Sequence, residues 1–511
     1  MRQRSRSRKS RRTRRGLRGL RRPDTARLAG FAAPSSRTPR WRPRRPGLST
    51  RTTGRRPGRR SPRRSPRRSG VSTLRPCPGP RLGPCASSSS CRSATPSIRA
   101  WRCGDSRFPY NEATRRRGRR KPGRPGISHR VGAVPEALAK VAASVFRPAV
   151  TGLVPYEPGK PVEEVQRELG LSRVVKLASN EGPYGPFPAA LEALARAAAE
   201  LNRYPDGGAY RLRGALAERH GVRFEEVAVG AGADALVDCV SQAVLNPGDE
   251  IVCGWPSFPS YVIDALKLGA VPRRVPLADH RYDLEAMLSE VGPRTKIVYV
   301  CHPNNPTGTM NSRAELDSYF EQVPGHVLTV LDQAYFEYID EPEYPDGVEE
   351  YLKAGRSVLV LRTFSKIYGL AGLRVGYGLA SEEMVAAIGK VKRAFDVSSA
   401  AQAAALASLD DGPEIERRRR LNAEGRVALT EAFLDHGLEP AGPAVANFLY
   451  VDVGDDARAL FDSLLHEGVI VRPLAGFGAP GAIRVSVGAP GENEFFSEAL
   501  GRVLAGVPTV T

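Results

Sequence analysis

The sequence has few acidic residues in its first quarter and few methionines anywhere. Residues 1–130 hold only Asp24, Asp105 and Glu112 against 41 of the chain's 77 lysines and arginines, and no methionine occurs between Met1 and Met287. A segment of Arg, Pro, Ser and Gly without apolar periodicity does not bury enough apolar surface to offset the conformational entropy lost on folding. We therefore expect residues 1–130 to be a disordered extension.

The extension has two possible interpretations, one functional and one in which it is not part of the native protein. Its charge would give salt-dependent binding to phosphate polymers, which would make the chain a nucleic-acid-binding regulator. The segment lacks, however, the apolar pattern of a folded reading helix and has few aromatic residues for stacking on bases. We favour the other interpretation, in which residues 1–130 are translated sequence upstream of a true start near Val131 or Val134.

Metal-binding cysteine patterns and long apolar runs are also lacking. Four of the seven cysteines lie in the extension at spacings of 8, 6 and 12 residues, which match no zinc pattern, and three lie in apolar segments where buried free thiols are common. No apolar run approaches the roughly 18 residues that a membrane span needs, and the start lacks the apolar segment of a secretory signal. We expect a cytoplasmic protein with no metal site and no membrane partner.

The rest of the chain is a different kind of polymer. It carries 36 basic and 51 acidic side chains, and it alternates short apolar runs with amphipathic segments. Strands that alternate with helices are typical of a largely parallel sheet with helices on both faces, so we predict an α/β fold. The seven predicted strands span residues 226–230, 250–256, 270–277, 296–303, 327–335, 357–365 and 375–380.

The pattern also predicts the domain boundaries. In an N-terminal arm, residues 131–175, three prolines keep the chain extended ahead of a helix. The sheet belongs to a large domain over residues 176–395. Beyond it, a charged helical stretch leads to FLYVDV, RALFDSLLHEG, VIVRPL and AIRVSVG, which are typical of a smaller α+β domain over residues 396–511.

Polar residues stand where several predicted strands end. GAGAD follows strand 226–230, and a glycine turn that leads into a helix at Asp234 predicts free backbone N–H groups that cradle an anion. NNPTG follows strand 296–303 and offers the amide of Asn305. Asp332 lies at the end of an apolar run, where a buried carboxylate needs a partner such as a protonated heterocyclic nitrogen. Each motif alone is also explained by a turn or by packing.

Lys366 emerges where strand 357–365 ends, and Arg374 follows eight residues later. A lysine is ordinarily a solvated charge, but ligands of open α/β sheets bind at the carboxyl ends of the strands. An anion cradle, a partner for a pyridinium nitrogen and a lysine that can form a Schiff base are together what pyridoxal phosphate (PLP) requires of a protein. The sequence therefore predicts a PLP site.

The order GAGAD, PSF, NNPTG, DQAY, SK and LRVG resembles the fold-type I aminotransferases. Within them, SNEGPYGP (179–186), NRYPDGGAYRLR (202–213) and IRVSVG are most similar to the histidinol-phosphate aminotransferases. The resemblance covers roughly residues 150–505. It implies a fold-type I PLP transferase, a homodimer with a shared active site, and ping-pong transamination between histidinol phosphate and 2-oxoglutarate in histidine biosynthesis.

The resemblance also implies roles for individual residues. Lys366 would bind the cofactor covalently and move the substrate proton, and Asp332 would keep the ring nitrogen protonated. Tyr335 and Asn305 would hydrogen-bond the phenolic oxygen, and Phe258 would stack on the ring. The phosphate would be bound by Ala233, Asp234, Thr363, Ser365, Arg374 and Tyr204 of the partner subunit. The substrate would be bound by Arg484, Asn180, Tyr156 and Arg472.

Some alternatives stay open at this point. Phe258 and Tyr335 are also explained as packing residues, and Arg472 as a surface charge. The cradle reads AGADA where many relatives have a serine and a glutamate around the aspartate, so backbone donors would have to suffice. Aromatic amino-acid aminotransferases and threonine-phosphate decarboxylases share nearly all of these motifs. Tyr156 and the loop 182–187 are the candidates for discriminating between the substrates.

Overall fold

A computed structural model describes residues 145–155 and 158–506. The expected extension, residues 1–130, and the predicted substrate residue Tyr156 lie outside the described residues. Contacts within the chain divide it between Pro122 and Gly123, and all described residues belong to the second unit. Within that unit the side chains pack around two large hydrophobic cores, one on the central sheet and one in the C-terminal part.

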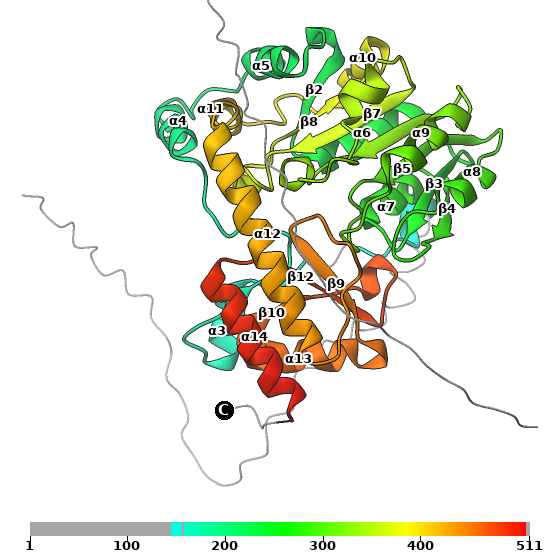
Figure 1. The fold of residues 1–511 in the computed structure, drawn as a ribbon. Helices are drawn as coiled ribbons and strands as arrows, with labels where there is room; N and C mark the ends of the chain where they lie inside the picture. The colour runs from blue at the N-terminus through cyan, green and yellow to red at the C-terminus, as the bar shows by residue number, and fades with distance from the viewer. Residues whose placement is uncertain (1–144, 156–157, 507–511) are drawn as a thin grey trace, which may run out of the picture. The chain divides into compact units, whose positions relative to one another are not determined.

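All seven predicted strands are present and form one sheet (Figure 1). The order across the sheet is β2-β8-β7-β6-β5-β3-β4, in which β8 is antiparallel to both of its neighbours and every other pair is parallel. The predicted α/β fold is therefore confirmed. The strands are β2 (Val227–Gly230), β3 (Glu250–Trp255), β4 (Val271–Pro276), β5 (Thr295–Cys301), β6 (Leu328–Asp332), β7 (Val358–Thr363) and β8 (Gly376–Leu379).

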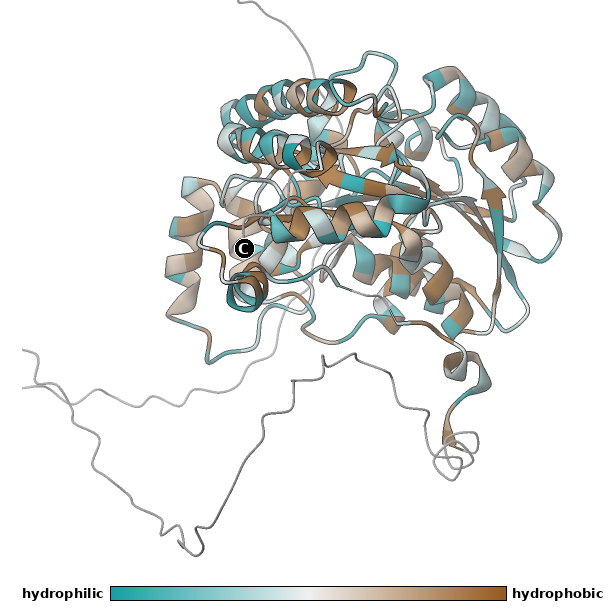
Figure 2. Cartoon of the chain, turned by 90° about the horizontal axis from the view of Figure 1, so that it is seen from below, coloured by the Kyte–Doolittle hydropathy of each residue, from teal (hydrophilic) through white to brown (hydrophobic). Residues whose placement is uncertain are grey.

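The inner strands are apolar because both of their faces are covered. All residues of β6 and β7 are buried. Figure 2 shows largely hydrophobic strands inside the molecule and helices around them with hydrophilic outer faces. The edge strand β4 is mostly exposed and carries Arg273 and Arg274. Charged side chains on an edge strand discourage pairing with other chains. The three cysteines of the described residues, Cys239, Cys253 and Cys301, are buried and free.

Two groups of helices cover the sheet. On one face lie α6 (Ala233–Val244), α7 (Pro259–Lys267) and α10 (Glu382–Val391), and Tyr261 of α7 reaches Asp332 of β6. On the other face lie α5 (Tyr210–His220), α8 (Leu284–Ser289) and α9 (Arg313–Gln322), and Tyr319 of α9 bonds Thr329 of β6. Beside α5, α4 (Pro188–Ala198) packs on α11 (Ser399–Ala407) (Figure 1).

The second core lies in the C-terminal part of the chain. An antiparallel sheet of order β11-β12-β9 is formed by β9 (Phe448–Asp452), β11 (Arg472–Pro473) and β12 (Ala482–Ser486). The stretch VIVRPL divides at Val471, because β10 (Val469–Ile470) pairs instead with β1 (Val175–Lys176). This core also takes Val165 of α3 (Val162–Leu169), so part of the expected arm packs with the C-terminal residues. Its other helices are α13 (Ala457–His466) and α14 (Pro490–Leu504).

Helix α12 (Gly412–Leu434) connects the two cores (Figure 1). It contacts the 3-10 turn Phe336–Tyr338 that follows β6, and it also contacts α14 and β9. The carboxyl ends of β5, β6 and β7 therefore lie near the C-terminal sheet. A short helix, α2 (Pro148–Thr151), packs on α7. In the described part of the chain, no helix is both long and apolar enough to cross a membrane.

Candidate active site

The carboxyl ends of the parallel strands bring the predicted cofactor residues together. Asp332 ends β6, while Asn305 and Lys366 lie on the loops that follow β5 and β7. Ten of the eleven residues expected to bind the cofactor line one cavity, and Cys301 and Ala334 complete it. The ten are Ala233, Asp234, Phe258, Asn305, Asp332, Tyr335, Thr363, Ser365, Lys366 and Arg374.

One end of the cavity is built for an anion. The N-terminus of α6 begins at Ala233, and Gly232 before it has a φ of 89°, which favours glycine. A Cβ at Gly232 would lie 2.7 Å from Nη2 of Arg374, so the missing side chain lets this guanidinium approach the helix end. Arg374 Nη1 lies 3.4 Å from the hydroxyl of Ser365, which also accepts a 3.0 Å hydrogen bond from Thr363. A cation, hydroxyls and helix N–H groups suit a phosphate.

Another wall of the cavity holds a buried carboxylate. Asp332 Oδ2 accepts a 2.7 Å hydrogen bond from the hydroxyl of Tyr261, and Oδ1 accepts one of 3.1 Å from the backbone N–H of Ala334. Burial nevertheless raises the pKa of Asp332 above its ordinary value. A cation in the cavity would offset that effect, which is what a protonated ring nitrogen provides. The residues present therefore fit the expected cofactor at this point.

Lys366 lies partly buried among these groups. Its Nζ donates a 3.2 Å hydrogen bond to the backbone oxygen of Asn180 and lies 5.4 Å from the ring centre of Tyr335. Burial, and then the positive charge of Arg484, lower the pKa of Lys366 to about 8. An amine with such a pKa is half neutral at about pH 8, whereas a lysine with the ordinary pKa of 10.5 is almost fully protonated there. Lys366 can therefore attack an aldehyde or take up a proton.

The C-terminal sheet contributes Arg484 to the same region. From β12 its Nη2 donates a 2.8 Å hydrogen bond to the backbone oxygen of Ala178, and its Nη1 donates to the side-chain oxygen of Asn305. Asn180 donates a 3.0 Å hydrogen bond to the hydroxyl of Tyr335. These bonds join residues expected to hold the cofactor with residues expected to hold the substrate.

Arg472 lies directly opposite Arg484 in the pairing of β11 with β12. Both side chains are buried, and the guanidinium carbons lie 5.4 Å and 5.3 Å from the ring centre of Phe477. The interpretation of Arg472 as a surface charge is therefore wrong. Two neighbouring buried guanidinium groups favour a ligand with anionic groups.

Tyr204 does not line the cavity of its own chain. Its side chain is 83% exposed and stacks on Phe395 with ring centres 4.8 Å apart. A large aromatic side chain with this exposure is suited to contact with another chain. The expected contact of Tyr204 with the site of a neighbouring subunit stays a prediction.

Two residues near the site carried no clear signal in the sequence. Tyr261, which bonds Asp332, lies three residues after Phe258 at the start of α7, and this helical spacing was the only hint. Arg418 of α12 donates hydrogen bonds of 2.9 Å to the backbone oxygen of Ile367 and 2.7 Å to that of Gly185. It therefore ties the lysine loop to the loop 182–187, yet in the run RRRR it resembled a solvated charge.

Comparisons with known proteins agree with this geometry. Residues 172–503 match the family Aminotransferase class I and II. Histidinol-phosphate aminotransferase of Moorella thermoacetica is 46% identical over 360 residues, which are 70% of this chain and 93% of the relative. Histidinol-phosphate aminotransferase 2 of Pseudomonas fluorescens is 46% identical over 71% of this chain and 98% of its own.

Solved structures have the same fold. The crystal structure of histidinol-phosphate aminotransferase from Sinorhizobium meliloti in complex with pyridoxal-5'-phosphate superposes with a TM-score of 0.66 at 30% identity, over 71% of this chain and 99% of that one. A single mutant of Thermus thermophilus aspartate aminotransferase superposes with a TM-score of 0.62 at 25% identity, over 70% and 99%.

Proposed function

Because the chain belongs to the class I and II aminotransferases, we propose that it transfers the amino group between histidinol phosphate and 2-oxoglutarate with PLP as cofactor. Its relatives at 46% identity carry the name histidinol-phosphate aminotransferase, and nearly their whole length is covered. The reaction is ping-pong, since one donor leaves its nitrogen on the enzyme before an oxo acid collects it. The names of these relatives also support a role in histidine biosynthesis.

One observation carries the proposal: Lys366, with a pKa lowered to about 8, shares a cavity with a buried carboxylate and with the anion-binding end formed by Arg374, Ser365 and the N-terminus of α6. A lysine with an appreciable neutral fraction near physiological pH is suited to capture an aldehyde. The carboxylate of Asp332 then matches the protonated ring nitrogen of the cofactor, and the anion-binding end matches its phosphate.

When bound, PLP supplies an electron-accepting ring for the electrons released at the substrate's α-carbon. The chain's own residues do the rest. The carboxylate of Asp332, which accepts a hydrogen bond from Tyr261, would keep the ring nitrogen of the cofactor protonated. Asn180 positions the hydroxyl of Tyr335 by a hydrogen bond. Lys366 Nζ, which the backbone oxygen of Asn180 positions through a hydrogen bond, would accept the proton released at the substrate's α-carbon and later donate it again.

Arg472 and Arg484 support a phosphorylated substrate. A phosphate carries close to two negative charges at neutral pH and three acceptor oxygens, which two adjacent guanidinium groups can share. The backbone pairing places the two arginines opposite each other, one strand apart. Glutamate, the expected donor, would use one of them for its side-chain carboxylate.

An aromatic amino-acid aminotransferase is the alternative function. Phenylpyruvate carries a single carboxylate and an apolar ring, so it offers the two arginines one negative charge and two acceptor oxygens, fewer than a phosphate does. The closer match in charge and in acceptor atoms favours a phosphorylated substrate over an aromatic one. Threonine-phosphate decarboxylation would use the phosphate, but the similar proteins compared above carry aminotransferase names.

The active unit we propose is a homodimer with a shared site. The exposed Tyr204, stacked on Phe395, supports this assembly, since a partner's copy of that ring would complete the anion-binding end of the cavity. Tyr204→Phe should then weaken PLP binding. In a mixed dimer of wild-type and variant subunits, an intact Tyr204 completes one of the two sites, and that site should bind PLP as the wild type does.

A half-reaction tests the proposed activity. Purified full-length protein loaded with PLP is mixed with histidinol phosphate in the absence of any oxo acid, and the absorbance of the bound cofactor is followed. We expect histidinol phosphate to cause a spectral change that corresponds to a single turnover. Glutamate should cause the same change, whereas 2-oxoglutarate alone should cause none. No spectral change with histidinol phosphate, together with a full change with phenylalanine, would contradict the assignment.

A further inference from the structure

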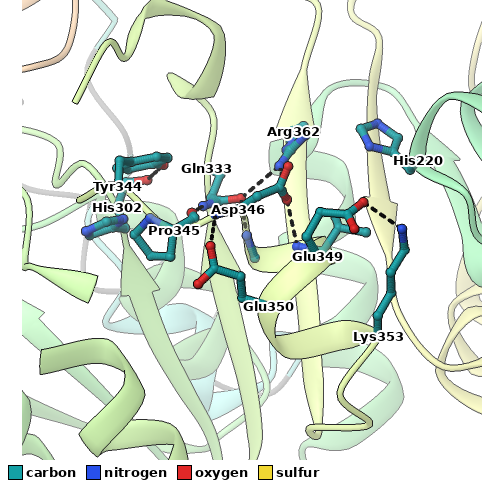
Figure 3. A network of polar contacts seen from close by, with 12 residues as sticks. His220, His302, Gln333, Tyr344, Pro345, Asp346, Glu349, Glu350, Lys353 and Arg362 are labelled. Carbon is teal, nitrogen blue, oxygen red and sulfur yellow. Dashed lines mark hydrogen bonds and ion pairs between the residues drawn. The ribbon is translucent and has the colours of Figure 1, made fainter. Parts of the chain in front are cut away.

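Strands β6 and β7 carry polar residues on both faces at their carboxyl ends. Asp332 pairs with Leu361, so Thr363, two residues further on, shares the face of Asp332. The intervening residues Gln333 and Arg362 therefore point to the reverse face, away from the cofactor cavity that Asp332 and Thr363 line. Figure 3 shows Gln333 and Arg362 beside one another, and we call them the reverse-face pair.

Gln333 is the centre of this arrangement. It is fully buried, and its Oε1 accepts hydrogen bonds of 3.1 Å from Arg362 Nη2 and 3.2 Å from the backbone N–H of Gly347. Its Nε2 donates a 2.8 Å hydrogen bond to the backbone oxygen of Pro345. One side chain thus joins β6, β7 and the segment 345–347, with its amide orientation fixed by bonds at both ends.

Arg362 is equally constrained. Its Nη2 forms a 2.7 Å ion pair with Asp346, and its guanidinium carbon lies 3.4 Å from the ring centre of Phe336. The side chain is only 2% exposed. Because a buried cation requires well-placed partners, the positions of Gln333 and Asp346 relative to Arg362 have little freedom.

The pair lies where backbone pairing between the two strands ends. The last backbone bond between them runs from the N–H of Gln333 to the oxygen of Leu361, at 2.9 Å. Beyond that point β7 continues to Thr363 beside β8, while the chain after β6 turns toward Tyr335. The side-chain bond between Gln333 and Arg362 is therefore the next link that keeps the two strand ends together.

We propose that Gln333 and Arg362 are positioning residues that fix the spacing between Asp332 and Thr363, and so between the two ends of the cofactor. The inference rests on the proposed function, because it takes the cavity to be the PLP site. Neither residue touches the cavity, so their effect reaches the cofactor only through the strand ends. A group that acts in this way tunes binding geometry without taking part in the reaction.

The test uses full-length Gln333→Met, which keeps the side chain's length but removes its hydrogen bonds, and Gln333→Glu, which keeps an acceptor for Arg362. Thr329→Val is the matched control, since Thr329 lies on β6 on the same face as Gln333, which directly follows that strand, and the change removes one buried hydrogen bond, to Tyr319. Two quantities are measured: the dissociation constant of PLP from the apo protein and the pH midpoint of the bound cofactor's absorbance. Thermal unfolding of each apo variant reports the change in stability.

We expect Gln333→Met to weaken PLP binding about tenfold, the loss that follows from leaving buried polar partners unsatisfied, and to shift the absorbance midpoint. Gln333→Glu keeps the acceptor for Arg362 and Gly347 but loses the donor to Pro345, so its PLP binding should fall between that of the wild type and that of Gln333→Met. Thr329→Val should lower stability alone. If Gln333→Met lowers stability but leaves both cofactor quantities unchanged, the inference is wrong. If Gln333→Met does not fold, Arg362→Lys is tested in its place, with the same measurements of the PLP dissociation constant and of the absorbance midpoint. Failure of the wild type to bind PLP would instead refute the proposed function.

Discussion

The hydroxyl of Tyr261 donates a 2.7 Å hydrogen bond to the carboxylate of Asp332 inside the sheet's carboxyl edge. Burial raises the pKa of Asp332, and this bond acts in the opposite direction by stabilising the charged form. The charge of Asp332 is what holds a protonated ring nitrogen in place. Tyr261 therefore supports the cofactor from a position that does not line the cavity.

Tyr261→Phe should make the enzyme more sensitive to acid. Without the hydroxyl, the pKa of Asp332 rises further, so protonation begins at a higher pH and the acid limb of the pH–rate profile moves upward. At neutral pH we expect a loss of about tenfold in kcat/KM, the size of one hydrogen bond to a charged group. A pH profile of kcat/KM for both proteins is the measurement, and an unchanged acid limb would contradict this role.

Lys366→Ala should abolish transamination while the protein still folds. Removal of a covalent catalytic group typically costs a factor of about a thousand or more. The absorbance of lysine-bound cofactor should also disappear, although PLP can still bind through the phosphate end. Lys353→Ala is the control, since Lys353 forms a surface ion pair with Glu349, and it should leave both readouts unchanged. Full activity of Lys366→Ala would remove this lysine from the mechanism.

The reactivity of Lys366 should depend on pH as expected for a pKa of about 8. A lysine with its ordinary pKa of 10.5 would gain reactivity steadily up to that pH, whereas Lys366 should gain it up to about 8 and then level off. The measurement is the rate at which apo protein captures PLP, trapped by borohydride and located by mass spectrometry. A rate that still climbs between pH 9 and 10.5 would show that the amine is not desolvated.

Arg472→Gln should affect phosphorylated substrates selectively. Loss of one of two buried guanidinium groups should raise the KM for histidinol phosphate about thirtyfold and change the KM for glutamate much less. Arg420→Gln, at an exposed arginine of α12, is the control with the same change in charge. Equal effects on both substrates would mean that Arg472 supports the fold of the C-terminal sheet and not the recognition of phosphate.

Much of the fold and of the cofactor cavity could be predicted because they depend on local pattern. Seven short apolar runs identify the strands, and in a parallel sheet their carboxyl ends meet at one edge, which brings Asn305, Asp332 and Lys366 together. The anion cradle, the buried carboxylate and the lysine at these strand ends then predicted the cofactor. The position of Arg472 was left open because a single arginine in VIVRPL gives no sign of burial, which depends on the pairing of β11 with β12.

Other residues could not be predicted because their partners are distant in the sequence. Arg418 bonds the oxygens of Ile367 and Gly185 from the first part of a charged helix. It lies on the buried face of α12 with Ile415, but its charge and the arginines beside it conceal that position in the sequence. Gln333 stands inside the motif DQAY but faces the other side of the sheet, so its contacts with Arg362 follow only from the register of β6 and β7.

The central claim is that this site aminates a phosphorylated imidazole substrate, and a comparison of two acceptors tests it most directly. Full-length protein with PLP and glutamate is offered imidazole-acetol phosphate or phenylpyruvate, and kcat/KM is measured for each. We expect the phosphorylated acceptor to be preferred by about a hundredfold or more, since it pairs with both Arg472 and Arg484. A clear preference for phenylpyruvate would contradict the substrate assignment while leaving the aminotransferase chemistry intact.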